Sequence, residues 1–228
     1  MSIAARLNEI RARIADAAAR ASRSPSDILL IAVSKTFPID AVRAAYDAGQ
    51  RDFGENRVQE LLQKMDAAPD LAARWHLIGH LQSNKARRAA ERVPVIHSVD
   101  SVDLLRRIDT AAAAVSQQPR VLVQVDLAGE TTKSGAPAAD LPGIFAQGRQ
   151  CAAARIVGLM LLPPLAENPE DARDWFRRLR EERDRLAASG IPTPMLSELS
   201  MGMSHDFEVA VEEGATMVRV GTAIFGQR

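Results

Sequence analysis

The sequence contains one cysteine, Cys151, and equal numbers of basic and acidic residues, 29 of each. A single cysteine excludes an internal disulfide framework and any zinc site that needs several cysteines, and it suits a reducing compartment. The absence of net charge argues against a nucleic-acid binder, which normally shows a basic excess. The N-terminal segment lacks the apolar stretch of a signal peptide, and no apolar run approaches the length of a membrane span. We therefore expect a cytoplasmic protein that binds neither nucleic acid nor a membrane.

Lysine is scarce as well. Only four of the 29 basic residues are lysines, namely Lys35, Lys64, Lys85 and Lys133. Arginine cannot replace lysine where a neutral amine must form, because the guanidinium keeps its proton. In a chain that otherwise uses arginine, the position of each lysine is therefore informative.

Apolar runs of strand length alternate with helical patterns along the chain. The predicted strands are Ile28–Lys35, Arg51–Phe53, Trp75–Gly79, Val95–Val99, Arg120–Leu127, Arg155–Leu162, Met195–Met201 and Thr216–Gly221. A further helix precedes them, from Ile3 to about Ala21, and the helices that follow strands five, six and seven are predicted at Leu141–Ala153, Glu170–Ala188 and His205–Glu213, the last capped by Ser204. Eight β/α units of this size predict an α/β fold, a single (β/α)8 barrel of the TIM type that spans residues 1–228 and has an extra N-terminal helix. A doubly wound open sheet is the main alternative, but it rarely needs eight regular units in so short a chain.

Polar and glycine-rich peptides follow several of the predicted strands. In such a barrel the functional residues lie at the C-terminal ends of the strands, and a phosphate site commonly follows strands seven and eight. The peptides are Ser34–Thr36, Gly54–Asn56, Gly79–His80, Thr132–Gly135, Ser200–Ser204 and Arg219–Thr222. They all fall on one rim of the predicted barrel, so we expect the functional site there.

Lys35 is the sharpest candidate on this rim. It ends an otherwise apolar strand, so we expect its amine to be partly desolvated, which favours the neutral, nucleophilic form. A Schiff base with an aldehyde is the chemistry that such an amine supports. The alternative is a lysine that extends from a strand end into solvent, and the residue alone favours neither interpretation.

Small and hydroxyl-bearing residues follow strands seven and eight. Ser200, Gly202, Ser204, Gly221 and Thr222 offer backbone N–H groups and hydroxyls to a phosphate, and a helix expected to begin near Ser204 would add its N-terminal field. Ordinary turn and cap chemistry is the alternative for each segment alone. Their joint position after strands seven and eight favours a phosphate site.

Arg219 lies inside the last strand, on the same face as Gly221. A buried arginine needs an acceptor, which is either a ligand ring nitrogen or a core carboxylate such as Glu198. Asn56 either donates to a ligand oxygen or caps the next helix. The four histidines do not have the spacing of a metal site, so we expect no metal.

Six peptides resemble the signature peptides of the pyridoxal 5′-phosphate homeostasis proteins. They are AVSKT, FGENRVQE, WHLIGHLQSNK, TTKSG, LSMGMSHD and VRVGTAIFG, and the resemblance extends from about Leu30 to Gly226. It implies the N-terminal barrel of alanine racemase, a fold type III architecture that binds pyridoxal phosphate. The resemblance implies that Lys35 forms the Schiff base and that Arg219 meets the pyridine nitrogen. It further implies that the phosphate is held by Ser200, Gly221 and Thr222 and that the pocket walls are formed by Asn56, Met201, Gly202 and Met203. Lys133 matches a second lysine linked to cofactor exchange.

The resemblance leaves a choice between a carrier and an enzyme. A racemase needs a second acid/base, which alanine racemase takes from a tyrosine near a C-terminal β-domain. The chain ends seven residues after Gly221, and its only tyrosine, Tyr46, is predicted on an outer helix. We therefore expect neither the β-domain nor a tyrosine that could act as the second acid/base. An arginine at the pyridine nitrogen also leaves that nitrogen largely unprotonated and the ring a poorer electron sink.

We therefore predict a monomeric, non-catalytic protein that holds pyridoxal phosphate in vitamin B6 homeostasis, with cofactor-dependent apo-enzymes as partners. A racemase-like enzyme is one alternative. A cofactor-free Schiff-base aldolase is the other, but it would need a general acid that the rim does not clearly supply.

Overall fold

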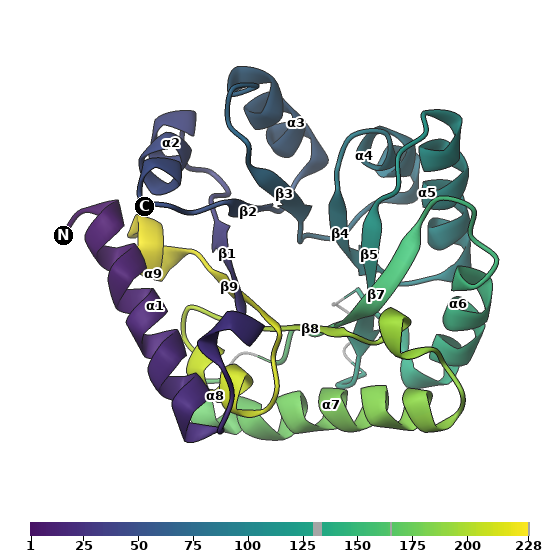
Figure 1. Cartoon of the computed structure of the whole chain (residues 1–228). Coiled ribbons are helices and arrows are strands. Elements are labelled where there is room, and N and C mark those ends of the chain that lie inside the picture. The colour runs from purple at the N-terminus through teal and green to yellow at the C-terminus, as the bar shows by residue number, and fades with distance from the viewer. Residues whose placement is uncertain (130–133, 165, 228) are drawn as a thin grey trace.

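The structure, a computed structural model, describes residues 1–129, 134–164 and 166–227. Eight parallel strands close into a barrel surrounded by a ring of helices (Figure 1). In barrel order the strands are β1 (Leu29–Val33), β2 (Asp52–Glu55), β3 (Arg74–Leu77), β4 (Val95–Val99), β5 (Arg120–Asp126), β7 (Arg155–Met160), β8 (Glu198–Met203) and β9 (Met217–Val220). Pairing of β9 with β1 and of β4 with β5 closes the circle. The predicted (β/α)8 barrel is confirmed.

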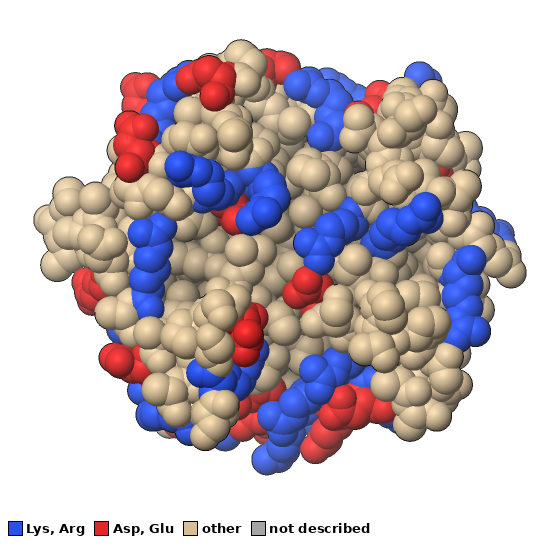
Figure 2. All heavy atoms as spheres, viewed as in Figure 1, with Lys and Arg blue, Asp and Glu red and all other residues tan. Residues whose placement is uncertain are grey.

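The helices of the described ranges lie outside the strands. They are α1 (Ile3–Arg20), α2 (Ile39–Asp47), α3 (Val58–Ala67), α4 (Ala86–Ala90), α5 (Val102–Ala114), α6 (Leu141–Gly148), α7 (Arg173–Ala188), α8 (Phe207–Glu212) and α9 (Thr222–Phe225). Within these ranges, none is both long and apolar enough to cross a membrane. On the face shown in Figure 2, basic side chains are interspersed with acidic and uncharged ones and form no continuous basic patch.

Helix α1 occupies the place in the ring beside the last strand. The short α9 follows β9, and α1 packs against both α8 and α9 (Figure 1). Arg13 of α1 forms an ion pair with Glu208 of α8 at 2.7 Å, and its guanidinium lies 4.8 Å from the centre of the Phe207 ring. The first helix of the chain therefore covers a seam between elements that come last in the sequence.

Three segments differ from the predicted elements. The helix expected to continue to Ala153 ends at Gly148, because the N–H groups of Ala152, Ala153 and Ala154 donate to Asp109 of α5 instead. The loop after β5 contains a two-residue strand, β6 (Ala136–Pro137), which pairs with the end of β5. The helix expected from Glu170 begins as a 3₁₀ turn and becomes α-helical only at Arg173.

The cap predicted for Ser204 is also different. Helix α8 begins at Phe207, two residues later than expected, and Asp206 is its N-cap residue. The carboxylate of Asp206 accepts the N–H of Met203 at 2.6 Å, which closes the turn before the helix. The Ser204 hydroxyl instead accepts the N–H of Gly221 at 3.0 Å and so joins the ends of β8 and β9.

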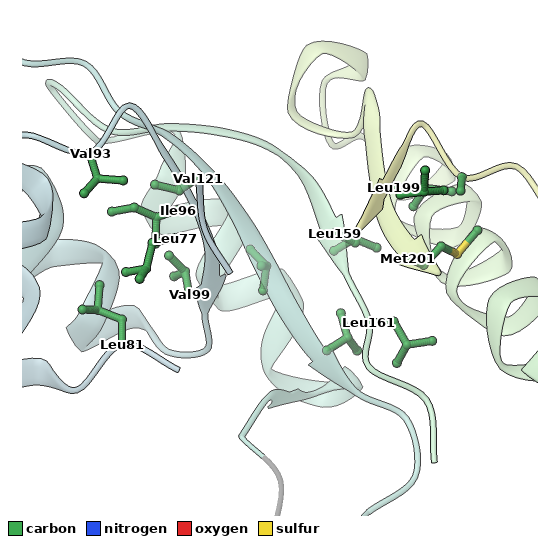
Figure 3. Packing of buried hydrophobic residues seen from close by; sticks show 14 of the residues in the cluster. Leu77, Leu81, Val93, Ile96, Val99, Val121, Leu159, Leu161, Leu199 and Met201 are labelled. Carbon is green, nitrogen blue, oxygen red and sulfur yellow. The ribbon is translucent and has the colours of Figure 1, made fainter. Parts of the chain in front are cut away.

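The main hydrophobic core lies between the barrel and its helices. Leu77, Ile96 and Val121 point outward from neighbouring strands, and Leu159, Leu199 and Met201 continue this layer around the barrel (Figure 3). Side chains alternate along a strand, so the residues between these point into the barrel. Each large apolar side chain removed from water in this layer stabilises the fold by about 1.5–3 kcal/mol.

The barrel interior is partly apolar and partly polar. Five buried side chains form an apolar layer across it: Ile31, Val95, Leu122, Met160 and Met217. His76, His97, Ser200 and Arg219 share the interior and are also buried. Buried polar groups are normally hydrogen-bonded, and these four side chains are hydrogen-bonded to one another in the interior.

Candidate functional site

A cavity of about 470 Å³ opens at the C-terminal mouth of the barrel. This volume is in the usual range for sites that bind small molecules. Its wall consists of Val33, Lys35, Asn56, Ile78, Gly79, His80, Leu162, Met203, Ser204, His205, Arg219, Gly221 and Thr222. The structure thus brings together seven of the predicted binding residues: Lys35, Asn56, Met203, Ser204, Arg219, Gly221 and Thr222.

Lys35 lies two residues after the end of β1, and its side chain is half-buried on the cavity wall. Within the described ranges, no hydrogen bond or ion pair engages its amine. The next residue, Thr36, has a φ of +66°, a left-handed conformation that β-branched residues rarely adopt. The Thr36 N–H donates to the carboxylate of Glu60 on α3. This contact fixes the sharp turn that presents Lys35 to the cavity.

A buried ionic cluster supports this turn from below. Lys64 of α3 donates from Nζ to the Ser34 carbonyl at 2.7 Å, to Glu55 Oε1 at 2.7 Å and to Glu60 Oε1 at 2.9 Å. The Ser34 hydroxyl donates to the same Glu55 oxygen at 2.6 Å. Burial raises the pKa of Glu55, although the bonds from Lys64 and Ser34 oppose it. For Glu60, burial is outweighed by its hydrogen bonds, so its pKa is lowered.

The sequence itself contains a pattern that indicates the Lys64 cluster. Lys64 lies four residues after Glu60, the spacing of an ion pair along one helix face. Lysine is also rare in this chain, yet Lys64 is 7 % exposed. A rare lysine that pairs with a carboxylate next to a functional loop would have been a reasonable candidate for a positioning residue.

Asn56 and Gly79 bring the ends of β2 and β3 together at the cavity. Asn56 lies on the wall, and Arg57 rather than Asn56 is the N-cap residue of α3, so the helix-cap interpretation is excluded. A Cβ atom on Gly79 would lie 2.3 Å from the backbone oxygen of Asn56. Only glycine permits this approach, and Asn56 is positioned by it.

Replacement of Gly79 by alanine is expected to lower the free energy of unfolding by about 1–3 kcal/mol, because the new methyl group must displace the Asn56 backbone. Urea unfolding measures the change. Gly143→Ala is the matched control, since a Cβ there has no neighbour within 4 Å. A helix favours alanine over glycine, so the control should be neutral or slightly stabilising. Equal stability of Gly79→Ala and the wild type would contradict the close approach.

Arg219 of β9 lies at the base of the cavity. It donates from NH1 to the Ser200 hydroxyl at 2.6 Å and from NH2 to the Leu161 carbonyl at 2.9 Å. Burial lowers the pKa of Arg219 to about 10, against the opposing charge of Asp206, so the guanidinium is still a cation at neutral pH. Glu198 is not its partner, because that carboxylate pairs with Arg120 at 2.6 Å.

Three of the predicted binding residues do not reach the cavity wall. The Ser200 hydroxyl lies inside the barrel, bonded to Arg219 and to His97. Met201 points outward into the core beneath the helices. Gly202 has a φ of +89° and faces α8, where a Cβ would lie 2.5 Å from Ala210. Alternation along β8 separates Ser200 from Met201, and the pairing with β9 shifts register between Ser200 and Met203, where Gly202 faces outward as well.

Lys133, the predicted second lysine, lies outside the described residues. Within the described ranges, no group of three or more His, Cys, Asp or Glu side chains is placed to hold a metal ion.

His76 and His97 form a pair that the sequence analysis missed. Their rings contact each other through His76 Nδ1 and His97 Nε2, 3.0 Å apart, and are 1 % and 0 % exposed. Burial lowers the pKa of both, against the bond to Asp52 in the case of His76. Neither spacing nor local pattern predicts this pair, because the two residues meet only when β3 and β4 align.

The free energy of unfolding is expected to fall as the pH is lowered from 7.5 to 5.5. Below the ordinary histidine value of 6.5, the unfolded chain binds protons that buried His76 and His97 resist. Stability therefore decreases by up to about 1.4 kcal/mol per pH unit for each histidine. The pKa of Asp52 is lowered in the folded protein, so the stability that this carboxylate contributes is lost only below about pH 3.8, outside the range tested.

Urea unfolding at several pH values measures this dependence. His80→Gln is the control, because it removes an exposed imidazole and leaves the buried pair in place. A stability that does not change over this range would show that the buried pair takes up protons freely.

The fold and the site together define a barrel of the alanine racemase type with a lysine on the wall of its C-terminal cavity. The family model described as the N-terminal domain of alanine racemase matches residues 5–228. The chain belongs to the pyridoxal phosphate homeostasis protein family, as its curated relatives show.

Two of these relatives are similar over the full chain. A pyridoxal phosphate homeostasis protein of Aquifex aeolicus is 43 % identical over 100 % of this chain and 99 % of its own length. One of Pseudomonas aeruginosa is 44 % identical over 100 % of this chain and 96 % of its own. Among solved structures, PipY of Synechococcus elongatus PCC7942 with pyridoxal phosphate bound is 43 % identical, with a TM-score of 0.87 and coverage of 99 % and 100 % of the two chains.

Proposed function

We propose that this protein binds pyridoxal 5′-phosphate in the C-terminal cavity and acts in the homeostasis of that cofactor. The observation that carries the proposal is that Lys35 and Arg219 lie on the wall of one 470 Å³ cavity, together with Gly221 and Thr222. The relatives named pyridoxal phosphate homeostasis proteins and the structure of PipY with bound pyridoxal phosphate support it.

The residues present fit this cofactor. Pyridoxal phosphate would supply an aldehyde, with which the Lys35 amine would form a C=N bond with loss of one water molecule. Lys35 is suited to this role because its amine has no protein partner within the described ranges. Arg219, a buried cation at neutral pH, can only donate hydrogen bonds, so it suits an unprotonated pyridine nitrogen.

The neighbouring parts of the wall, after β8, β9 and β2, suit the phosphate and the ring oxygen. Ser204, Gly221 and Thr222 follow the last two strands, where barrels of this type commonly hold phosphate. Of the two predicted serines, Ser204 lies on the wall, whereas the Ser200 hydroxyl is already bonded inside the barrel. Asn56, at the end of β2, offers an amide to a ligand oxygen.

The arrangement favours a carrier over an enzyme. Tyr46, the only tyrosine, lies under the Arg51 guanidinium at 3.8 Å on α2 and does not line the cavity, so it cannot serve as the second base of a racemase. A ring nitrogen bonded to Arg219 would remain unprotonated, which weakens the ring as an electron sink. We therefore infer that this protein retains the cofactor and delivers it to apo-enzymes. It would act as a monomer in the cytoplasm, with residues 1–228 forming a single barrel domain.

The test is the absorption spectrum of the purified protein with added pyridoxal phosphate, followed by borohydride reduction and peptide mapping. A visible band and a reduced adduct on the peptide with Lys35 are expected. With only four lysines in the chain, the adduct can be assigned without ambiguity. A protein that stays colourless, or an adduct confined to another lysine, would refute the proposal.

A further inference from the structure

A line of buried polar side chains crosses the barrel interior beneath the cavity. From Arg219 on β9 it passes to Ser200 on β8 at 2.6 Å and then to His97 on β4 at 2.9 Å. It continues to His76 on β3 at 3.0 Å and ends at Asp52 on β2 at 2.9 Å. Each of these five residues is at most 3 % exposed. The line therefore connects the cavity to the opposite mouth of the barrel through protein alone.

Asp52 determines where the hydrogens lie at the far end of the line. Arg74 donates to both of its carboxylate oxygens at 2.8 Å. Burial raises the pKa of Asp52, but the bonds from His76 and Arg74 outweigh it and lower the pKa overall. An ionised carboxylate can only accept, so His76 Nε2 must carry a hydrogen.

The remaining hydrogens follow from this one. A neutral His76 accepts at Nδ1, so His97 donates from Nε2. A neutral His97 then accepts at Nδ1, so the Ser200 hydroxyl donates to it. Arg219 has no acceptor and donates to the Ser200 oxygen. All four bonds are satisfied by one arrangement, in which every hydrogen is donated in the direction from Arg219 toward Asp52.

The neutral state of both histidines agrees with their surroundings. A second cation at His97 would lie one serine away from the Arg219 guanidinium. A cation at His76 would face Arg74 through Asp52, and the two imidazole rings are only 5.2 Å apart. Like charges this close in a buried region disfavour one another.

We propose that Ser200, His97, His76 and Asp52 are positioning residues that orient the Arg219 guanidinium for the pyridine ring of the bound cofactor. The proposal rests on the function proposed above. A guanidinium has five N–H donors, and the bonds to Ser200 and Leu161 use two of them, which leaves donors for the cavity. An arginine that is held before the ligand arrives loses less side-chain freedom on binding, and this favours affinity.

The first test compares Ser200→Ala with Ser98→Ala. Both serines are 0 % exposed and lie on barrel strands, but the Ser98 hydroxyl donates to the Gly79 carbonyl at 2.7 Å and lies outside the line. We expect Ser200→Ala to raise the Kd for pyridoxal phosphate about tenfold. We also expect it to shift the absorption maximum of the bound cofactor, while the reduced adduct still maps to Lys35. Ser98→Ala should keep the wild-type Kd and spectrum.

The outcomes separate the two proposals. A wild-type protein that takes up no pyridoxal phosphate refutes the proposed function. A wild-type adduct on Lys35 combined with a Ser200→Ala variant that matches Ser98→Ala in Kd and spectrum refutes only the positioning role.

A second measurement needs no variant. Nitrogen-15 NMR of the wild-type histidines should show His76 and His97 as neutral rings with the hydrogen on Nε2. It should also show their signals shifting when pyridoxal phosphate is added. A hydrogen on Nδ1 of His97, a charged ring at neutral pH, or signals that ignore the cofactor would overturn the inference even if Ser200→Ala fails to fold.

Discussion

Replacing Lys35 by alanine is expected to abolish the visible band of bound pyridoxal phosphate and to raise its Kd on the order of 100-fold, equivalent to about 2.7 kcal/mol. Lys35 carries the only amine on the described cavity wall, so no other wall residue can form the C=N bond. Arg219, Ser204 and Thr222 would still make non-covalent contacts. Spectroscopic titration with the cofactor, before and after borohydride, measures both effects.

Lys85→Ala is the matched control for this prediction. Lys85 also follows a strand on the same side of the barrel, but it does not line the cavity. Its removal should leave the band and the Kd unchanged. A band that persists in Lys35→Ala would show that another amine holds the cofactor, and the cavity would then lose its assigned chemistry.

Replacing Lys64 by methionine is expected to lower the free energy of unfolding by about 3–5 kcal/mol, because the Glu55 carboxylate would remain buried without its cation. Glu55 is 0 % exposed, and its Oε2 atom has no hydrogen-bond partner within the described ranges. Lys64 also donates to the Ser34 carbonyl directly before Lys35, so the variant should loosen the turn that presents Lys35. Urea unfolding measures the loss of stability.

Two further variants show whether charge is the cause. Lys85→Met removes a half-exposed lysine that the structure does not place in an ion pair with any described residue, and it should change stability by less than about 0.5 kcal/mol. The double variant Lys64→Met with Glu55→Gln should recover part of the loss, since a neutral amide needs no counter-charge. If Lys64→Met unfolds at the wild-type urea midpoint, the cluster does not support the turn.

The strands were predictable because of how parallel barrels bury them. Strands with helices on one side and a filled interior on the other are buried on both faces and read as continuous apolar runs. The run that ends at Lys35 and the run that includes Arg219 were recognised in this way. The C-terminal ends of the strands then indicated the rim, so the residues that line the cavity could largely be named from the sequence.

The parts that could not be predicted depend on contacts between distant segments. Helix α6 ends early because Asp109 of α5 takes the N–H groups that would have continued it. Met201 and Ser200 separate to opposite faces of β8, and only the register of the strand decides which one faces inward. The His76–His97 pair requires two strands to align side by side. Patterns within one segment contain none of this information.

Helix α1 has a consequence for how the chain acquires its structure during synthesis. Helix α1, with its buried Leu7, Ile10 and Ile14, leaves the ribosome well before α8 and α9, which it contacts and which follow about 200 residues later. Until then α1 can contact earlier segments such as the turn at Pro25–Asp27 and α2, but not α8 and α9, its main neighbours in the structure. Long sequence separation of contacting segments slows folding, so the docking of α1 should be a late event that completes the ring.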